Sequence, residues 1–173
     1  MRPSRAIALS AICSAICALI LTIGEYFPTL SLGAAFTAGI VIMIPLAKGS
    51  FKCAALTYLS GGALAFLLSF MRYEAILPFI AFFGLQPIVN AWQVKKGFNK
   101  YLMLAVKALW FAGVLVGYYY IFDAVLFDGN EQLEKFALPI LAVGGIVLYA
   151  IYDGLSFYFQ KYIDVLVKRI SRK

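Results

Sequence analysis

Six apolar stretches alternate with short polar segments along almost the whole chain, and this alternation predicts the helices of a membrane protein. A helix needs about 20 mostly apolar residues to cross a bilayer core of about 30 Å, and most of the stretches are close to that length. Strands are not expected, because an open sheet cannot satisfy its backbone in lipid and the stretches lack sustained period-two alternation. The expected spans are 6–24, 30–47, 53–71, 75–92, 101–122 and 137–160.

Composition agrees with a chain that lies almost wholly in the bilayer. Hydrophobic residues make up 64% of the 173 positions, whereas a soluble domain is about 45–50% apolar. Since the connections are short, we expect an all-α membrane protein, a single transmembrane domain over residues 1–173 in which six helices form one bundle. The first span has the basic start of a signal peptide, but the turn at 24–28 leads straight into another span, which favours a retained helix.

Lys and Arg residues lie on alternate sides of the spans, which predicts an orientation. With the N-terminus in the cytoplasm, the outer segments hold only Arg72 and Lys135, and Lys107 lies inside the fifth span. The inner segments hold twelve of the fifteen basic residues: Arg2, Arg5, Lys48, Lys52, Lys95, Lys96, Lys100, Lys161, Lys168, Arg169, Arg172 and Lys173. This positive-inside distribution places both termini in the cytoplasm of a multi-pass cell-membrane protein. The net charge of +7 then serves orientation and contact with anionic lipid headgroups, and no nucleic-acid partner is expected.

The chain offers little material for catalysis or metal binding. It has no His for proton transfer near neutral pH, and it lacks the HExxH, P-loop and GxSxG motifs. No pair of acidic residues stands at metal-ligand spacing within a span. Cys13, Cys17 and Cys53 form no CxxC motif and are interpreted as small packing residues. We therefore expect no enzyme, no cofactor and no metal.

Small residues are concentrated in the first span. Ala11 and Ala15 stand four residues apart and stack on one helix face, with Ala8 one turn earlier. Ser10, Ser14 and Ala18 form an adjacent stripe. Small residues let a second helix approach closely in lipid. The alanines could therefore serve packing within the bundle or docking of a partner.

The fourth span is interrupted by polar residues and prolines. It contains Pro78, Gly84, Gln86, Pro87 and Asn90. Pro87 has no N–H, which removes one helical hydrogen bond and frees the carbonyl of the residue four positions earlier. A broken, polar helix at this depth is tolerated only against protein or a cavity. Three readings remain: a pocket wall, a partner surface, or a kink needed for packing.

Two charges, Lys107 and Asp153, fall inside the predicted membrane. Each lies about 10 Å from the inner end of its span at a rise of 1.5 Å per residue. Adjacent antiparallel helices could bring them together and offset the cost of burying each charge. The alternative is that Lys107 extends alone to the inner surface.

A polar cluster is expected at the outer face. Glu25 and Tyr26 lie in the first outer turn, Arg72 and Glu74 in the second, and Asp123 follows the fifth span. Turns of a small bundle can converge over a pocket, where a charge orients a small polar molecule and aromatic walls bury it. The plainer reading is a set of solvated loop charges. These five residues are the candidate substrate-binding residues.

Several segments resemble the substrate-binding S components of energy-coupling factor (ECF) transporters. The similarity lies in ALSAICSA at 8–15, in Gly24 and PTLSL at 28–32, in EAIL at 74–77 and in FFGLQPI at 82–88. Length, six spans and cytoplasmic termini also fit, although the similar motifs are confined to spans one to four.

The resemblance implies a prokaryotic import subunit that binds a vitamin-like small molecule near the outer face. Such a subunit docks onto a transmembrane coupling subunit driven by two cytoplasmic ATPases. The family's docking motif maps onto Ala11 and Ala15, with Ala8 one turn earlier. The chain carries no signature that names the substrate, and its lack of His argues against nickel or cobalt. The main rival is a membrane scaffold similar to the cell-shape protein MreD; a lipid-modifying enzyme would need an acidic or nucleophilic cluster that is not found.

Overall fold

The computed structural model of the chain describes residues 3–121 and 137–171, and it confirms the all-α fold for them. These residues form six helical segments and no strand. The chain divides into two compact units. The first unit is Met1–Lys95 with Ser156–Lys173, and the second unit is Lys96–Leu155.

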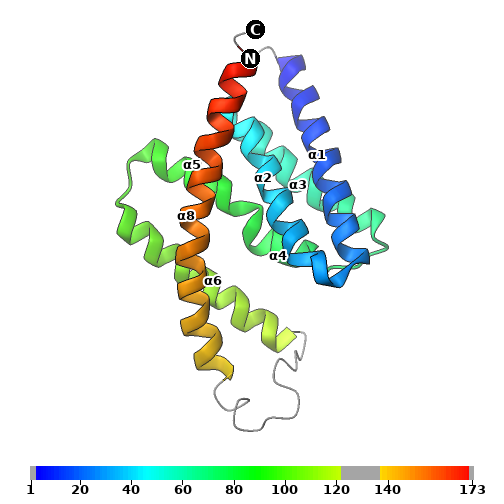
Figure 1. The fold of residues 1–173 in the computed structure, drawn as a ribbon. Helices are drawn as coiled ribbons and strands as arrows, with labels where there is room; N and C mark the ends of the chain where they lie inside the picture. The colour runs from blue at the N-terminus through cyan, green and yellow to red at the C-terminus, as the bar shows by residue number, and fades with distance from the viewer. Residues whose placement is uncertain (1–2, 122–136, 172–173) are drawn as a thin grey trace. The chain divides into compact units, whose positions relative to one another are not determined.

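The first unit contains the first four helical segments and the C-terminal half of the last helix (Figure 1). In chain order the elements are α1 (Pro3–Tyr26), a 3₁₀ turn η1 (Pro28–Leu30), α2 (Ser31–Ala47), α3 (Phe51–Leu68), α4 (Ile76–Pro78), a π-helical turn η2 (Phe79–Phe83), α5 (Leu85–Lys96), α6 (Lys100–Ile121) and α8 (Ala137–Ser171). The start of α1 and the end of α8 lie at one end of this unit, called here the termini end. The opposite end, where α1 ends and α4 begins, is called the Glu25 end.

Four of the described helices are long and apolar enough to cross a membrane. They are Ser4–Tyr26, Phe51–Leu68, Ile76–Lys96 and Lys100–Gly117. The second predicted span corresponds to a shorter apolar helix, Ser31–Ala47. The sixth corresponds to α8, whose 35 residues continue well beyond the expected end at 160. Hydropathy marks only the apolar part of that helix, and its basic last turn, with Lys168 and Arg169, extends it.

The third helix ends earlier than the sequence predicted. Ser50 caps its start, because its side chain accepts a hydrogen bond from the backbone N–H of Cys53 at 3.3 Å. The helix ends at Leu68, whereas the predicted span ran to 71. Phe70 and Met71 adopt positive φ angles of 54° and 64°, a left-handed conformation that ends a helix. Apolar residues therefore continue beyond the helix into a turn.

The fourth segment is broken, as its prolines predicted. Between α4 and α5 the backbone N–H of Gly84 donates to the carbonyl of Phe79 at 2.8 Å, the five-residue step of a π turn. Pro87 has no N–H and so cannot donate the helical hydrogen bond to the carbonyl of Phe83. That carbonyl oxygen faces α2, since a Cβ added at Gly39 would lie 2.5 Å from it. Glycine at position 39 is therefore required for α2 to approach the break.

The core of the first unit forms where α1 packs against α2 and α3. Cys17 is fully buried there, and a Cβ at Gly61 of α3 would lie 2.8 Å from the Cβ of Cys17. Cys13 and Cys53 are also buried. All three thiols thus occupy packing positions, as interpreted from the sequence.

The second unit contains α6 and the N-terminal part of α8. The two helices approach closely at Gly145, where an added Cβ would lie 2.8 Å from a methyl group of Leu115. The rings of Phe111 and Tyr149 meet beside this point at a tilt of 37°, with centroids 5.6 Å apart. The close approach lets polar groups on the two helices meet.

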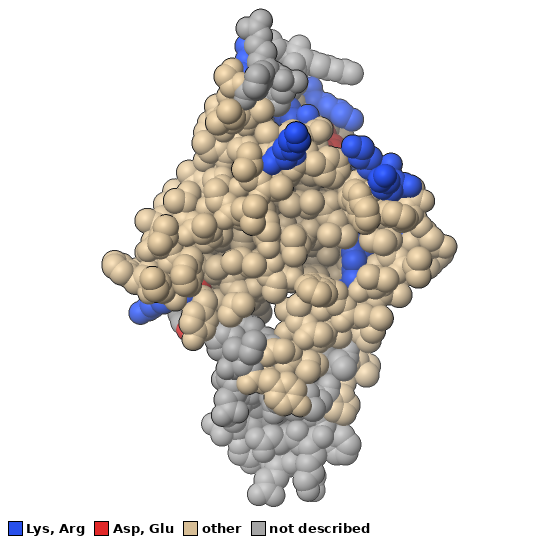
Figure 2. Space-filling model, turned by 180° about the vertical axis from the view of Figure 1, so that it is seen from behind, with Lys and Arg blue, Asp and Glu red and all other residues tan. Residues whose placement is uncertain are grey.

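Charged side chains are few on the surface drawn in Figure 2. Lys and Arg gather mainly at the termini end of the first unit, and a broad uncharged surface adjoins them. Many large apolar side chains are exposed, including Ile12 and Leu19 of α1 and Leu67 of α3. A water-exposed surface of this kind would be costly, whereas lipid contact makes it favourable.

Candidate functional site

Glu25, in the last turn of α1, is one of the most buried residues, with 1% of its surface exposed. Its Oε1 accepts hydrogen bonds from the backbone N–H groups of Ala75 at 2.8 Å and Ile76 at 2.9 Å. Its Oε2 accepts one from the N–H of Glu74 at 3.0 Å. These donors begin α4, where N–H groups lack partners within the helix and a negative charge is favourable.

The Glu25 carboxylate therefore ties α1 to the start of α4. The neighbouring Gly24 permits this approach, since a Cβ there would lie 2.5 Å from the Cβ of Ala34 and 3.2 Å from that of Ala75. Both carboxylate oxygens have partners within the protein, and the residue is not a solvated loop charge. The geometry assigns Glu25 a structural role that the sequence did not reveal.

Tyr26 and Arg72 come together from the first and second turns at the Glu25 end. The guanidinium carbon of Arg72 lies 5.4 Å from the centroid of the Tyr26 ring, within cation–π range. Both side chains are exposed, as is Glu74, whose backbone binds Glu25. The structure thus brings together four of the five predicted binding residues; Asp123 lies outside the described residues.

Helix α1 presents two different faces. Ser10 and Ser14 are buried against α3: the Ser14 Oγ lies 2.6 Å from that of Ser60, and the Ser10 hydroxyl donates to the carbonyl of Cys53 at 3.3 Å. The predicted docking residues behave oppositely, since all three are exposed: Ala8, Ala11 and Ala15. The serine stripe therefore serves packing within the bundle, whereas the alanine strip does not.

Lys107 and Asp153 form a buried ion pair in the second unit. The distance from Nζ to Oδ1 is 2.6 Å, and the two residues are 6% and 5% exposed. The hydroxyl of Tyr149 donates to the same carboxylate oxygen at 3.0 Å. Of the two alternatives that the sequence left open, the structure thus shows the pairing and not a Lys107 that extends alone to the membrane surface.

The polar residues of the broken segment face another helix. Asn90 of α5 donates from Nδ2 to the hydroxyl of Ser156 on α8 at 3.2 Å, and Gln86 donates to Asn90 at 3.5 Å. All three are buried. One turn further along α5, the Oε1 of Gln93 is buried without a hydrogen-bond partner. The polarity of this span is thus directed at protein, as the cost of a polar group in lipid requires.

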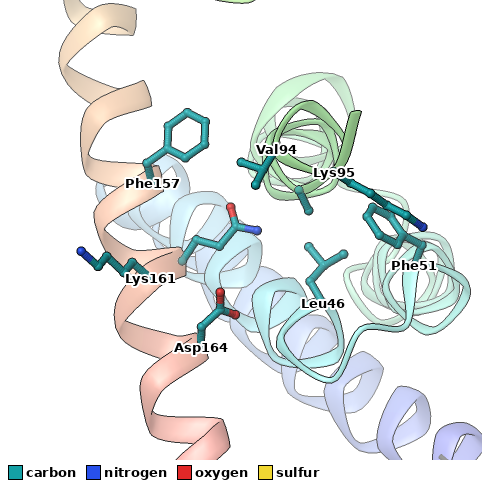
Figure 3. A pocket seen from close by; sticks show the side chains of 9 residues that line it. Leu46, Phe51, Val94, Lys95, Phe157, Lys161 and Asp164 are labelled. Atoms are coloured by element: carbon teal, nitrogen blue, oxygen red, sulfur yellow. The ribbon is translucent and has the colours of Figure 1, made fainter. Parts of the chain in front are cut away.

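A pocket of about 330 Å³ lies at the termini end of the first unit, at the ends of α2 and α5 (Figure 3). Its lining residues are Leu46, Phe51, Ala91, Val94, Lys95, Phe157, Gln160, Lys161 and Asp164. In Figure 3 the Asp164 carboxylate points into this space, whereas the Lys161 side chain points away from it. This pocket is at the opposite end from the predicted binding cluster.

Comparisons with family models, with curated proteins and with solved structures give no match. The resemblance to ECF components therefore rests on the motifs in the chain itself. Within residues 3–121 and 137–171, no group of three or more His, Cys, Asp or Glu residues could hold a metal ion.

Sequence reasoning missed Gln160 and Asp164 as candidate site residues. A signal was present, because Ser156, Gln160 and Asp164 recur every four residues and so share one face of α8. The partners that complete the pocket come from α2, α3 and α5, far away in the sequence. No local pattern indicates that these helices converge on this face.

Proposed function

We propose that this chain is the substrate-capture subunit of an ECF-type importer in a prokaryotic cell membrane. On this proposal its helices span the membrane several times and both termini are cytoplasmic. The distribution of Lys and Arg between the segments supports the orientation. The four long apolar helices support the membrane location.

The exposed alanine strip on α1 is the observation that carries the proposal. Ala8, Ala11 and Ala15 lie within about 60° of one another on a helix of 3.6 residues per turn. A smooth strip of this kind lets a second helix approach its backbone closely. Since the packing of α1 within the bundle uses the serine stripe instead, the alanines remain available to a coupling subunit.

Arg72, Tyr26 and Glu74 would take part in substrate capture at the Glu25 end, the outer end on the proposed orientation. Arg72 offers a charge to an anionic group of the ligand, and the Tyr26 ring offers an aromatic wall. Glu25 would hold the two turns in place through its backbone hydrogen bonds. The captured vitamin-like molecule would pass inward when the coupling subunit and its two ATPases act.

A non-transport scaffold of the MreD type is the second candidate function. It is favoured by the Glu25 carboxylate, whose two oxygens are already occupied by backbone N–H groups. It is also favoured by the position of the 330 Å³ pocket, which lies at the other end. An enzyme is not proposed, since neither the sequence nor the described sites group residues for catalysis.

Mass spectrometry of the small molecules that co-purify with the detergent-solubilised protein tests the transport proposal. A capture subunit should retain one vitamin-like compound in near-stoichiometric amount, and the Arg72→Ala variant should retain less. The Lys52→Gln variant is the matched control, because it removes an exposed basic residue at the opposite end. A protein that carries no small molecule, and that no vitamin stabilises against heating, would favour the scaffold.

A further inference from the structure

The pocket at the termini end contains one buried acceptor without a hydrogen-bond partner and, beside it, a half-buried carboxylate. The Oε1 of Gln160 is buried and accepts no hydrogen bond. Asp164, one turn further along α8, takes part in no ion pair within the described parts of the chain, although Lys161 is only three residues away. An unpaired buried acceptor is costly. A bound group that carries N–H donors and a positive charge would satisfy the Gln160 oxygen and would also pair with the half-buried Asp164 carboxylate.

Basic side chains accompany these acceptors. Lys161 and Lys95 belong to the lining of the same pocket, from α8 and α5, and both are exposed. The Lys161 ammonium points away from the space, and the Lys95 ammonium lies 5.0 Å from the centre of the Phe51 ring, so both lysines stand at the rim. With two lysines and one aspartate the lining has a net positive charge, which disfavours a ligand with only a positive charge, whereas Asp164 disfavours a purely anionic one. The charges therefore favour a ligand that carries an ammonium group and an anionic group a few bonds apart.

The location of the pocket adds a further constraint. It lies where α2 and α5 end and α3 begins, which is the level of lipid headgroups if these helices cross the bilayer. The other walls are apolar, with Leu46, Val94 and Phe157 among them. A volume of about 330 Å³ is at the lower end of the range for ligand sites, which suits one small headgroup.

We propose that this pocket binds an aminoethyl phosphate group. The ammonium would donate hydrogen bonds to Asp164 and Gln160. The phosphate would lie at the rim, where the exposed side chains of Lys95 and Lys161 would turn toward it. The group could come from the headgroup of phosphatidylethanolamine or from a free phosphoethanolamine molecule. This site is separate from the proposed capture site at the Glu25 end and does not depend on transport.

Native mass spectrometry of the purified protein tests the proposal. The protein is equilibrated with mixed micelles that contain equal amounts of phosphatidylethanolamine, phosphatidylcholine and phosphatidylglycerol. We expect the phosphatidylethanolamine adduct to exceed the phosphatidylcholine adduct about tenfold, because three methyl groups remove the N–H donors of a charge-assisted hydrogen bond. Equal retention of the two lipids by the wild-type protein would overturn the proposal.

Variants locate the preference in the pocket. Asp164→Asn and Gln160→Leu should each reduce the preference for the primary amine, and Asp164→Glu should retain it. Lys161→Gln should weaken both zwitterionic lipids alike, whereas Lys52→Gln, outside the pocket, should change neither. If Asp164→Asn and Gln160→Leu both unfold at the wild-type temperature and keep the full preference, the lipid binds elsewhere and the proposal fails.

Soluble phosphoethanolamine distinguishes the two sources. If it displaces the lipid adduct at millimolar concentration, the headgroup alone provides the binding energy and a free molecule can occupy the site. If the lipid remains bound while still showing the amine preference, the occupant is the lipid. Once the variants have established that the pocket prefers a primary amine, either result identifies whether its occupant is the lipid or the free molecule.

Discussion

The ammonium of Lys107 lies 2.6 Å from Oδ1 of Asp153, and both side chains are almost fully buried between α6 and α8. Each charge alone would cost several kcal/mol in a low-dielectric interior. The pair, with the Tyr149 hydroxyl as a further donor, makes both charges tolerable there. Such a contact also fixes the relative position of two helices along their axes.

Reversing the charge of one member of this pair should destabilise the protein strongly. We expect Lys107→Asp or Asp153→Lys alone to lose at least the roughly 3–5 kcal/mol that removal of one partner costs, because two like charges are then buried side by side. The double variant with both changes should recover a large part of the loss. Thermal unfolding in detergent measures the three variants. A double variant no more stable than the worse single one would show that the pair is not the source of the stability.

Replacing Glu25 should loosen the connection between α1 and α4. Glu25→Ala leaves three backbone N–H groups without their acceptor, at a cost of about 1–3 kcal/mol for each buried one. Glu25→Gln keeps one acceptor oxygen and should lose less. Glu74→Ala, an exposed neighbour, should be close to wild type in a thermal melt. Equal melting temperatures for Glu25→Ala and Glu74→Ala would refute the capping role.

Arg72 should influence binding of an anionic ligand at the Glu25 end. A thermal-shift screen against vitamins identifies a stabilising compound in the wild-type protein. Arg72→Ala should weaken its binding by about tenfold, the value of one charge-assisted hydrogen bond. Arg72→Lys should recover only part, because Lys cannot form the planar two-point contact. An unchanged dissociation constant in Arg72→Ala would move the capture site away from this end.

The proposed orientation can be tested with the native cysteines in place. Cys13, Cys17 and Cys53 are 1%, 0% and 5% exposed, so they should react slowly with a membrane-impermeant thiol reagent. A Cys introduced at exposed Tyr73 should be labelled in intact cells, whereas one at exposed Lys48 should be labelled only after permeabilisation. The reverse pattern would place the termini outside the cell.

The sequence predicted the helices well because hydropathy and helix length are local properties. It also indicated that Lys107 and Asp153 could pair, since a fixed rise per residue places both at one depth, but it left a lone Lys107 as the alternative. The break in the fourth segment was expected from Pro87, but its π turn at 79–83 lies upstream of that residue. The close approach of Gly39 to the Phe83 carbonyl accompanies this geometry, and it depends on tertiary packing.

The functions of particular polar residues were harder to predict. Glu25 is an ordinary turn residue in the sequence, and its partners come about 50 residues later. Asp164 lies beyond the apolar part of α8, so hydropathy indicated only a cytoplasmic tail. Both residues acquire their roles from contacts between distant segments. A local pattern predicts the face on which a side chain lies and not the groups that meet it.

Docking through α1 is the central claim, and co-purification of the tagged protein from its native cells tests it most directly. We expect the wild-type protein to bring down an ECF coupling subunit and two ATPases, and Ala11→Trp or Ala15→Trp to lose them while melting like wild type. Ile16→Trp is the matched control, since Ile16 is exposed but lies about 110° around the helix from the centre of the strip. Ser14→Trp should unfold the protein, because Ser14 is 3% exposed. Co-purification of cell-shape proteins instead, or retention of the ECF subunits by both alanine variants, would contradict the account.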